Sequence, residues 1–292
     1  MPRSQTKGQS ELQTAAVKEH LDACLKKRTL QLPMLARVVS EAMELCNAPD
    51  TGTEELSAVL HRDQNLAGQV LRVANSPLVR PATPIVSLEQ AIPRLGLRQV
   101  MEIVLTASLR ANIFDNQQHE RVMLHFWKHA VATGCFVREI AGLLRDHGNG
   151  YFICGLFHNV GKPMVLNALA SLEKTLGKPV VETDVVMAIN EYHIALGAEL
   201  ARSWNLPEQV EKSILYYRDY AAKSSFRDVA TMVNLASQLG DFLVCSDGSP
   251  EPEDAVDFSR LPVCHDLDFS ANDIDTLLGE TDKIRATVQA ML

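Results

Sequence analysis

The chain is poor in aromatic residues, which make up 5% of its 292 residues, although its hydrophobic content is 46%. Leucine, alanine and valine supply much of that content, and this favours helices over sheets. The apolar fraction is large enough for a sizeable core. The length is typical of one large domain or of two closely packed ones.

Paired cysteines and long apolar runs are also missing. No two of the six cysteines have the Cys-x-x-Cys spacing of a zinc ribbon or a redox motif. No uninterrupted apolar run reaches about 18 residues, and the polar N-terminus lacks the apolar region of a signal peptide. We therefore expect a protein of the reducing cytoplasm that does not associate with a membrane.

There is no excess of positive charge. The 28 Lys and Arg residues against 36 Asp and Glu residues give a formal net charge of −8. This balance argues against electrostatic binding of nucleic acid. No internal repeat of solenoid period is visible.

The chain does contain a succession of helical patterns. Apolar residues recur at helical spacing from Glu11 onward, and Asp63, Ser87 and Ser270 are expected helix N-caps. We predict an all-α fold with four parts: a disordered tail at 1–10, an N-terminal helical lobe at 11–116, a second helical lobe at 117–244, and an acidic loop plus a C-terminal helix packed on the core at 245–292.

Two segments are too hydrophobic for the surface of a lobe. They are the run Val100–Leu109 and the run Tyr151–Phe157. We expect them to share one interface or adjoining parts of one core. The polar segment 115–120 between them is then a surface connection, not a flexible linker between independent domains.

The stretch that carries chemistry is 155–162, Gly-Leu-Phe-His-Asn-Val-Gly-Lys. It resembles the core of the HD phosphohydrolase signature, His-Asp-Val-Gly-Lys, in which a histidine and an aspartate ligate a divalent metal. This chain has Asn159 where the signature has aspartate. Asn159 is neutral and offers one carbonyl oxygen. Because hard divalent cations are held by carboxylate charge, this change weakens a metal site.

The N-terminal third resembles a related family, the HDOD domain of bacterial signalling proteins. The resemblance spans roughly 30–220, and Gln64 departs mildly from the family's Asp-Pro-x-Leu turn. The segments that carry it are Leu32-Pro33, Arg62-Asp63-x-x-Leu66, Leu71-Arg72-Val73-Ala74-Asn75-Ser76 and Ser87-Leu88-x-x-Ala91-Ile92-x-x-Leu95-Gly96. It implies an N-terminal helical lobe packed on an HD-like lobe, and a regulatory role exerted by contacting other signalling proteins.

The same resemblance locates the remains of a metal site. His129 matches the first metal-ligating histidine, and Ser237 matches the last aspartate. Only His129 and His158 are then left as metal ligands, and two neutral imidazoles do not set up a metal-hydroxide nucleophile. We therefore expect no cofactor and no catalysis. His129, His158 and Asn159 should instead form a buried hydrogen-bonded cluster that fixes the helices.

Two alternatives stay open at this point. One is a metal-dependent phosphohydrolase acting on a nucleotide or phosphoester. The other is a sensor that binds a nucleotide without cleaving it, in a vestigial pocket lined by His129, His158, Asn159, Lys162 and His193. Lys162 can meet a phosphate as a point charge, although a solvated lysine near a helix end is the more ordinary interpretation.

Overall fold

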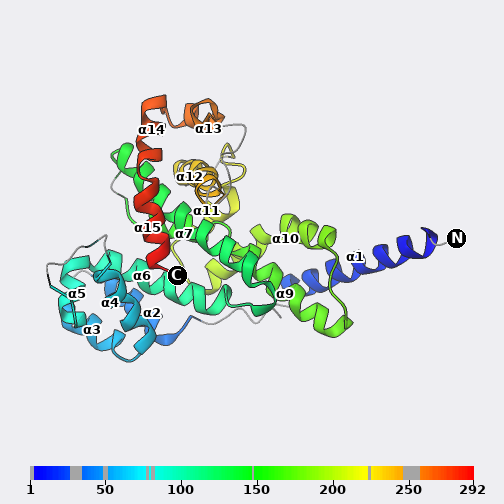
Figure 1. The fold of residues 1–292 in the computed structure, drawn as a ribbon, viewed down its shortest axis with the longest axis horizontal. Helices are drawn as coiled ribbons and strands as arrows, with labels where there is room; N and C mark the ends of the chain where they lie inside the picture. Colours follow the sequence, from blue (N-terminus) through cyan, green and yellow to red (C-terminus); the bar gives the residue numbers. More distant parts are fainter. Residues whose placement is uncertain are drawn as a thin grey trace.

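The protein is described by a computed structural model for residues 3–26, 35–48, 52–76, 79, 83–146, 148–222, 225–245 and 257–292. Throughout these residues every regular element is a helix, which confirms the predicted all-α fold. Figure 1 shows α2–α5 gathered at one end of the molecule, with α9–α12 lying away from them.

The first group of helices precedes residue 114. It consists of α2 (Arg37–Asn47), α3 (Thr53–Leu60), α4 (Gln64–Ala74), α5 (Leu88–Leu95) and α6 (Leu97–Ile113). Asp63 and Ser87 cap α4 and α5 as predicted, each accepting a hydrogen bond from a backbone N–H of the first turn. Leu32-Pro33, one of the segments that carry the family resemblance, lies outside the described residues.

The second group surrounds the long helix α7. After the short 3₁₀ turn η1 (Gln117–His119) come α7 (Glu120–Leu143), α8 (Tyr151–Phe157), α9 (Gly161–Leu176), α10 (Glu182–Ser203), α11 (Glu208–Tyr216) and α12 (Arg227–Cys245). Helix α7 packs against α8 and α12 and is buried over most of its length. Trp127 and Phe136 on α7 are fully buried, which makes this helix the centre of the core.

The two groups meet along α6. This helix packs on α2, α4 and α5 with one side and contacts α8 and α9 with another. The predicted shared interface of the two apolar runs is therefore confirmed, because they lie on α6 and α8. Residues 115–120 connect α6 to α7 and are exposed or half-buried, as expected for a surface connection.

A close helix crossing sets the position of the site. The Cα of Gly134 on α7 lies 2.6 Å from where a Cβ on Gly155 of α8 would stand. A second crossing brings Gly161 of α9 against the backbone carbonyl of His193 on α10, 1.7 Å from the position of a Cβ. Any side chain at Gly155 or Gly161 would push these helices apart. The segment between them, 156–160, is held in the core as a result.

Helix α1 (Arg3–Lys26) differs from the expectation in two ways. It begins at Arg3 instead of Glu11, so most of the segment predicted as a disordered tail is helical; no proline lies between residues 3 and 26 to interrupt it. It also packs on α9 and α10 rather than on the N-terminal lobe to which 11–116 was assigned. Gln13 donates to the carbonyl of Pro179 and Thr14 to Asp184.

The C-terminal region holds more structure than the single helix predicted for it. It contains η2 (Phe258–Arg260), α13 (Pro262–Asp266), α14 (Ala271–Gly279) and α15 (Thr281–Ala290). Ser270 and Asp273 form the predicted capping box, but the helix stops at Gly279 and a new one starts at Thr281. Both α14 and α15 pack on α7. Part of the predicted acidic loop, 246–256, lies outside the described residues.

Candidate functional site

The five predicted site residues come from four places in the chain. His129 lies on α7, His158 directly follows α8, Lys162 lies in the first turn of α9 and His193 on α10. His129, His158, Asn159 and His193 are each no more than 2% exposed, whereas Lys162 is half-buried. Three buried imidazoles in one core are costly unless their nitrogens find partners.

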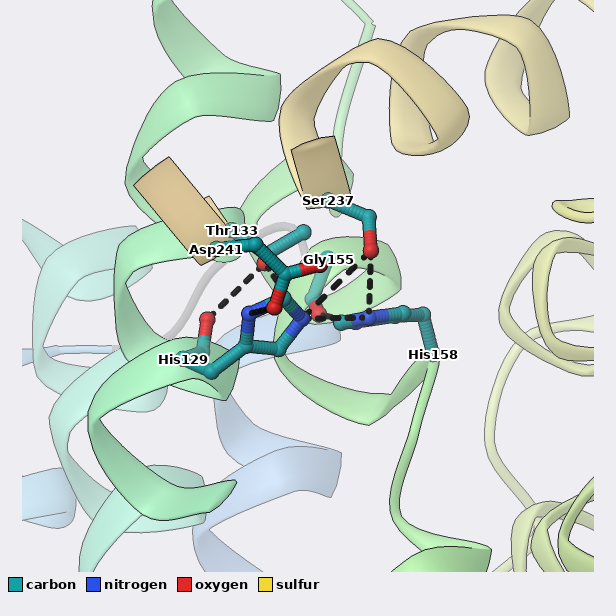
Figure 2. Close-up of polar contacts among 6 residues, drawn as sticks. All are labelled: His129, Thr133, Gly155, His158, Ser237 and Asp241. Atoms are coloured by element: carbon teal, nitrogen blue, oxygen red, sulfur yellow. Dashed lines mark hydrogen bonds and ion pairs between the residues drawn. The ribbon is translucent and has the colours of Figure 1, made fainter. Parts of the chain in front are cut away.

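His129 and His158 contact each other directly. Their Nε2 atoms are 3.1 Å apart, and Ser237 Oγ lies 3.4 and 3.3 Å from the two nitrogens (Figure 2). His158 Nδ1 is 2.6 Å from the carbonyl oxygen of Gly155. A carbonyl only accepts, so His158 carries its proton on Nδ1 and its Nε2 accepts from His129 Nε2–H. Burial first, and then the charge of His129, hold the pKa of His158 well below its usual value.

A carboxylate lies on the other side of the His129 ring. Asp241 Oδ1 is 2.9 Å from His129 Nδ1, an ion-pair distance, although the direction of approach does not meet hydrogen-bond geometry. Desolvation raises the pKa of Asp241, but His129, Lys162 and His125 outweigh it and the net pKa is lowered. The His129 ring therefore has His158 at its Nε2 and the Asp241 carboxylate at its Nδ1.

Tyr217 connects the histidine pair to His193. The ring of His158 packs edge-on against Tyr217, with centroids 5.0 Å apart, and the Tyr217 hydroxyl is 3.2 Å from His193 Nε2. His193 Nδ1 is 2.7 Å from the carbonyl of Ile189, so Nδ1 donates and Nε2 accepts from the tyrosine. Burial, followed by the charge of Arg218, lowers the pKa of His193 to about 4.

Asn159 and Lys162 depart from what the sequence predicted. Asn159 is fully buried, yet neither its Oδ1 nor its Nδ2 has a hydrogen-bond partner among the described residues. The histidines therefore form the expected buried cluster without Asn159. Lys162 is not a solvated lysine: its Nζ lies 5.6 Å from the centroid of the Phe126 ring, and burial lowers its pKa.

Comparison with known proteins identifies the fold family. The family model of the HDOD domain matches residues 32–220. The chain belongs to the HDOD domain family. Within the part of the chain that the structure describes, no helix is both long enough and apolar enough to cross a membrane.

Relatives of this HDOD protein are distant in sequence. An uncharacterized protein of Treponema pallidum (strain Nichols) is 26% identical over 243 residues, or 80% of this chain; the chain spans 46% of that relative's length. The crystal structure of an HDOD domain protein of unknown function from Geobacter sulfurreducens is 22% identical with a TM-score of 0.70, covering 97% of this chain and 99% of its own.

Two further solved structures share the fold. A protein of Shewanella amazonensis SB2B named as a candidate metal-dependent phosphohydrolase has a TM-score of 0.68 at 18% identity, covering 94% of this chain and 99% of its own. A Marinobacter aquaeolei VT8 protein named as a candidate signal transduction protein has a TM-score of 0.68 at 21% identity, covering 95% of this chain and 66% of its own. Similarity at these identities shows the fold alone.

The donor set of the HDOD site does not fit a divalent metal. The Nε2 atoms of His129 and His158 are close enough to share one ion, but the groups beside them are the neutral Ser237 and Asn159. The carboxylate of Asp241 faces Nδ1, on the other side of the ring. Among the described residues no group of three or more His, Cys, Asp or Glu side chains is placed to hold a metal ion. Hard cations need converging oxygen charge, which this site lacks.

Ser237, His129 and Asp241 also resemble a catalytic triad, with Ser237 in the place of the nucleophile, His129 of the base and Asp241 of the carboxylate. The Ser237 to His129 distance of 3.4 Å is long for a nucleophile and its base. The hollow beside α4 and α6 and the hollow between α6, α7 and α15 are not lined by any residue of this cluster. With its long Ser237–His129 distance, the arrangement is suited to holding α7, α8 and α12 together rather than to acyl transfer.

The sequence prediction missed Asp241, although a signal for it was present. Ser237 was matched to the last aspartate of HD enzymes, and Asp241 lies one helical turn later on the same face of α12. A carboxylate within one turn of a proposed ligand position is a candidate partner for the same histidine. Tyr217 also lies against the histidines, with its ring centroid 5.0 Å from that of His158.

Proposed function

We propose that this HDOD domain is a non-catalytic regulatory module that acts through contacts with other signalling proteins. One observation carries the proposal: the carboxylate nearest the His129–His158 pair faces the wrong nitrogen to complete a metal site. A buried, internally bonded cluster stabilises helices and leaves the surface for partners. The signal-transduction name of the Marinobacter relative supports the same direction. The cytoplasmic location expected from the sequence stays a prediction.

A metal-dependent phosphohydrolase is the second candidate. The 3.1 Å separation of the two Nε2 atoms favours it, because two ligands of one metal ion stand about this far apart. The phosphohydrolase name of the Shewanella relative points the same way.

Metal analysis with a panel of phosphodiesterase and nucleotidase substrates separates the two. The regulatory proposal expects less than stoichiometric metal and no turnover in the wild type. The matched control is the double variant Asn159→Asp/Ser237→Asp, which restores two carboxylates and should raise metal content. One metal ion per wild-type chain, with turnover that His158→Ala abolishes, would establish the enzyme instead. Capture of partners from a lysate of the native host then tests the signalling role.

A further inference from the structure

A hollow of about 550 Å³ lies away from the histidine cluster, between α6, α7 and α15. It is lined by six charged side chains: Arg94, Arg98, Glu102, Arg138, Glu139 and Lys283. Four positive charges against two negative ones give this hollow a net charge of +2, in a chain whose net charge is −8. Positive charge concentrated inside a hollow attracts anions.

The two carboxylates hold some of these cations in place. Glu102 is only 7% exposed, burial raises its pKa, and its oxygen lies 3.4 Å from Arg138. Glu139 lies 3.9 Å from Arg138 and 3.6 Å from Lys283. Arg138 and Lys283 are thereby held at the hollow, and their side chains stay 43% and 55% exposed. Lys283 also pairs with Glu280, at 2.7 Å.

The other two cations have no carboxylate partner. Arg94 donates to the backbone carbonyl of Val79, at 3.2 Å. Arg98 is exposed and forms no ion pair with any residue that the structure describes. Each guanidinium presents up to five N–H donors in a plane, and a phosphate group can accept two of them at once.

The N-terminus of α6 opens on the same hollow. Gly96 is its N-cap and has no side chain to bond the first backbone N–H groups, and the first turn has no acidic residue. Arg98 stands in this first turn, where the helix dipole disfavours a positive charge. A bound anion would relieve both the free N–H groups and the unfavourable arginine.

We propose that this hollow binds the phosphate groups of a phosphorylated small molecule of nucleotide size. Its volume lies in the range of small-molecule sites. The charges lie in a concave space between the lobes, and this suits a compact ligand better than an acidic segment of a protein. The site does not depend on the regulatory function proposed above, because its residues are not those of the histidine cluster.

Calorimetric titration of the full chain with inorganic pyrophosphate and with ATP, both in EDTA, tests the site. Arg98→Gln should weaken binding about tenfold or more, the effect of losing one charge-assisted hydrogen bond. Arg98 forms no ion pair with any described residue, and its charge acts on Glu102 less than that of Arg138 does, so this variant should fold normally. The double variant Arg138→Gln/Glu102→Gln removes both members of an ion pair, so the buried Glu102 carboxylate is not left without Arg138, and it should weaken binding similarly. Arg121→Gln is the matched control, since Arg121 is exposed on α7 and does not line the hollow.

Three results would overturn the proposal. The first is no binding of either probe at millimolar concentration. The second is equal weakening by Arg98→Gln and Arg121→Gln, which would show attraction to overall charge. The third is binding of poly-glutamate without binding of pyrophosphate or ATP, which would make the hollow a docking site for an acidic protein segment. Binding of pyrophosphate or ATP that Arg98→Gln selectively weakens establishes the site.

Discussion

Asp241 Oδ1 lies 2.9 Å from His129 Nδ1, while the other nitrogen of the same ring faces His158. The carboxylate therefore lies behind the His129 ring, on the side away from His158. Comparable carboxylates behind histidines fix the tautomer and the ring orientation in many proteins. Here the ring so fixed is the one that donates to His158.

Asp241→Asn should destabilise the protein by about 1 kcal/mol or less, because the aspartate is largely exposed and its ion pair is screened. Chemical denaturation at pH 7 measures the change. Asp275→Asn is the control, since Asp275 is exposed on α14 and forms no ion pair with any residue that the structure describes. If both substitutions have the same effect, the His129–Asp241 pair does not stabilise the fold.

His158→Ala should destabilise the protein by roughly 1–3 kcal/mol, because it leaves the Nε2–H of His129 and the carbonyl of Gly155 without their partner. Urea unfolding followed by circular dichroism measures this. His265→Ala, at an exposed position of α13, is the matched control. A His158→Ala protein as stable as wild type would indicate that water enters the cluster, and would reopen the interpretation as a ligand site.

The free energy of unfolding should fall as the pH falls from about 6.5 to about 4. Free histidine has a pKa of about 6.5, and that of His193 is about 4 in the fold. Between these values the unfolded chain binds protons that the folded chain does not, so stability is complete above 6.5 and is lost on acidification. His158, with its lowered pKa, acts in the same direction. The loss from His193 alone is on the order of 3 kcal/mol.

Urea unfolding at several pH values measures this dependence. His193→Gln should lower the stability at pH 7 but flatten its slope between 6.5 and 4. His265→Gln should leave the slope unchanged, since His265 is exposed. A wild-type slope that His193→Gln does not alter would show that His193 titrates at its ordinary pKa.

Asn159→Leu should leave the protein as stable as the wild type or more stable by about 1 kcal/mol. The two polar atoms of Asn159 are buried and lack partners among the described residues, so the amide is desolvated without compensation. Thermal denaturation checks the sign. Asn234→Leu is the matched control and should be destabilising, since Asn234 donates to the carbonyl of Tyr217 and accepts from Gln238. Equal losses in the two variants would mean that Asn159 is bonded, for example to buried water.

The features that the sequence predicted well are those with a local cause. Helical periodicity and side-chain caps depend on residues three or four apart, and the caps at Asp63, Ser87 and Ser270 are found where expected. The apolar runs of α6 and α8 meet because a run that hydrophobic has to be covered.

The features that the sequence did not reveal depend on long-range contacts. Helix α1 packs on α9 and α10 through pairs such as Tyr192 with Asp22, 170 residues apart. The buried state of Lys162 depends on Phe126 of a different helix. Asn159 lies between α8 and α9, and its lack of hydrogen-bond partners among the described residues depends on how the surrounding helices pack. No local sequence pattern predicts that packing.

The last prediction concerns the unity of the fold. Helix α6 packs on both groups of helices, and α1 at the N-terminal end packs on α9 and α10 of the second group. A fragment 1–116 would therefore expose the face of α6 that covers α8 and α9, and would leave α1 without its partners. A fragment 117–292 would expose the matching faces of α8, α9 and α10.

We expect at least one of the two fragments to be insoluble or molten when expressed alone, and the intact chain to unfold in a single transition. A single transition would indicate one rigid unit with no hinge between the lobes. Differential scanning calorimetry of the intact chain and of both fragments is the measurement. Two soluble fragments with sharp and independent transitions would instead indicate two domains joined by a mobile connection, which can change their relative orientation.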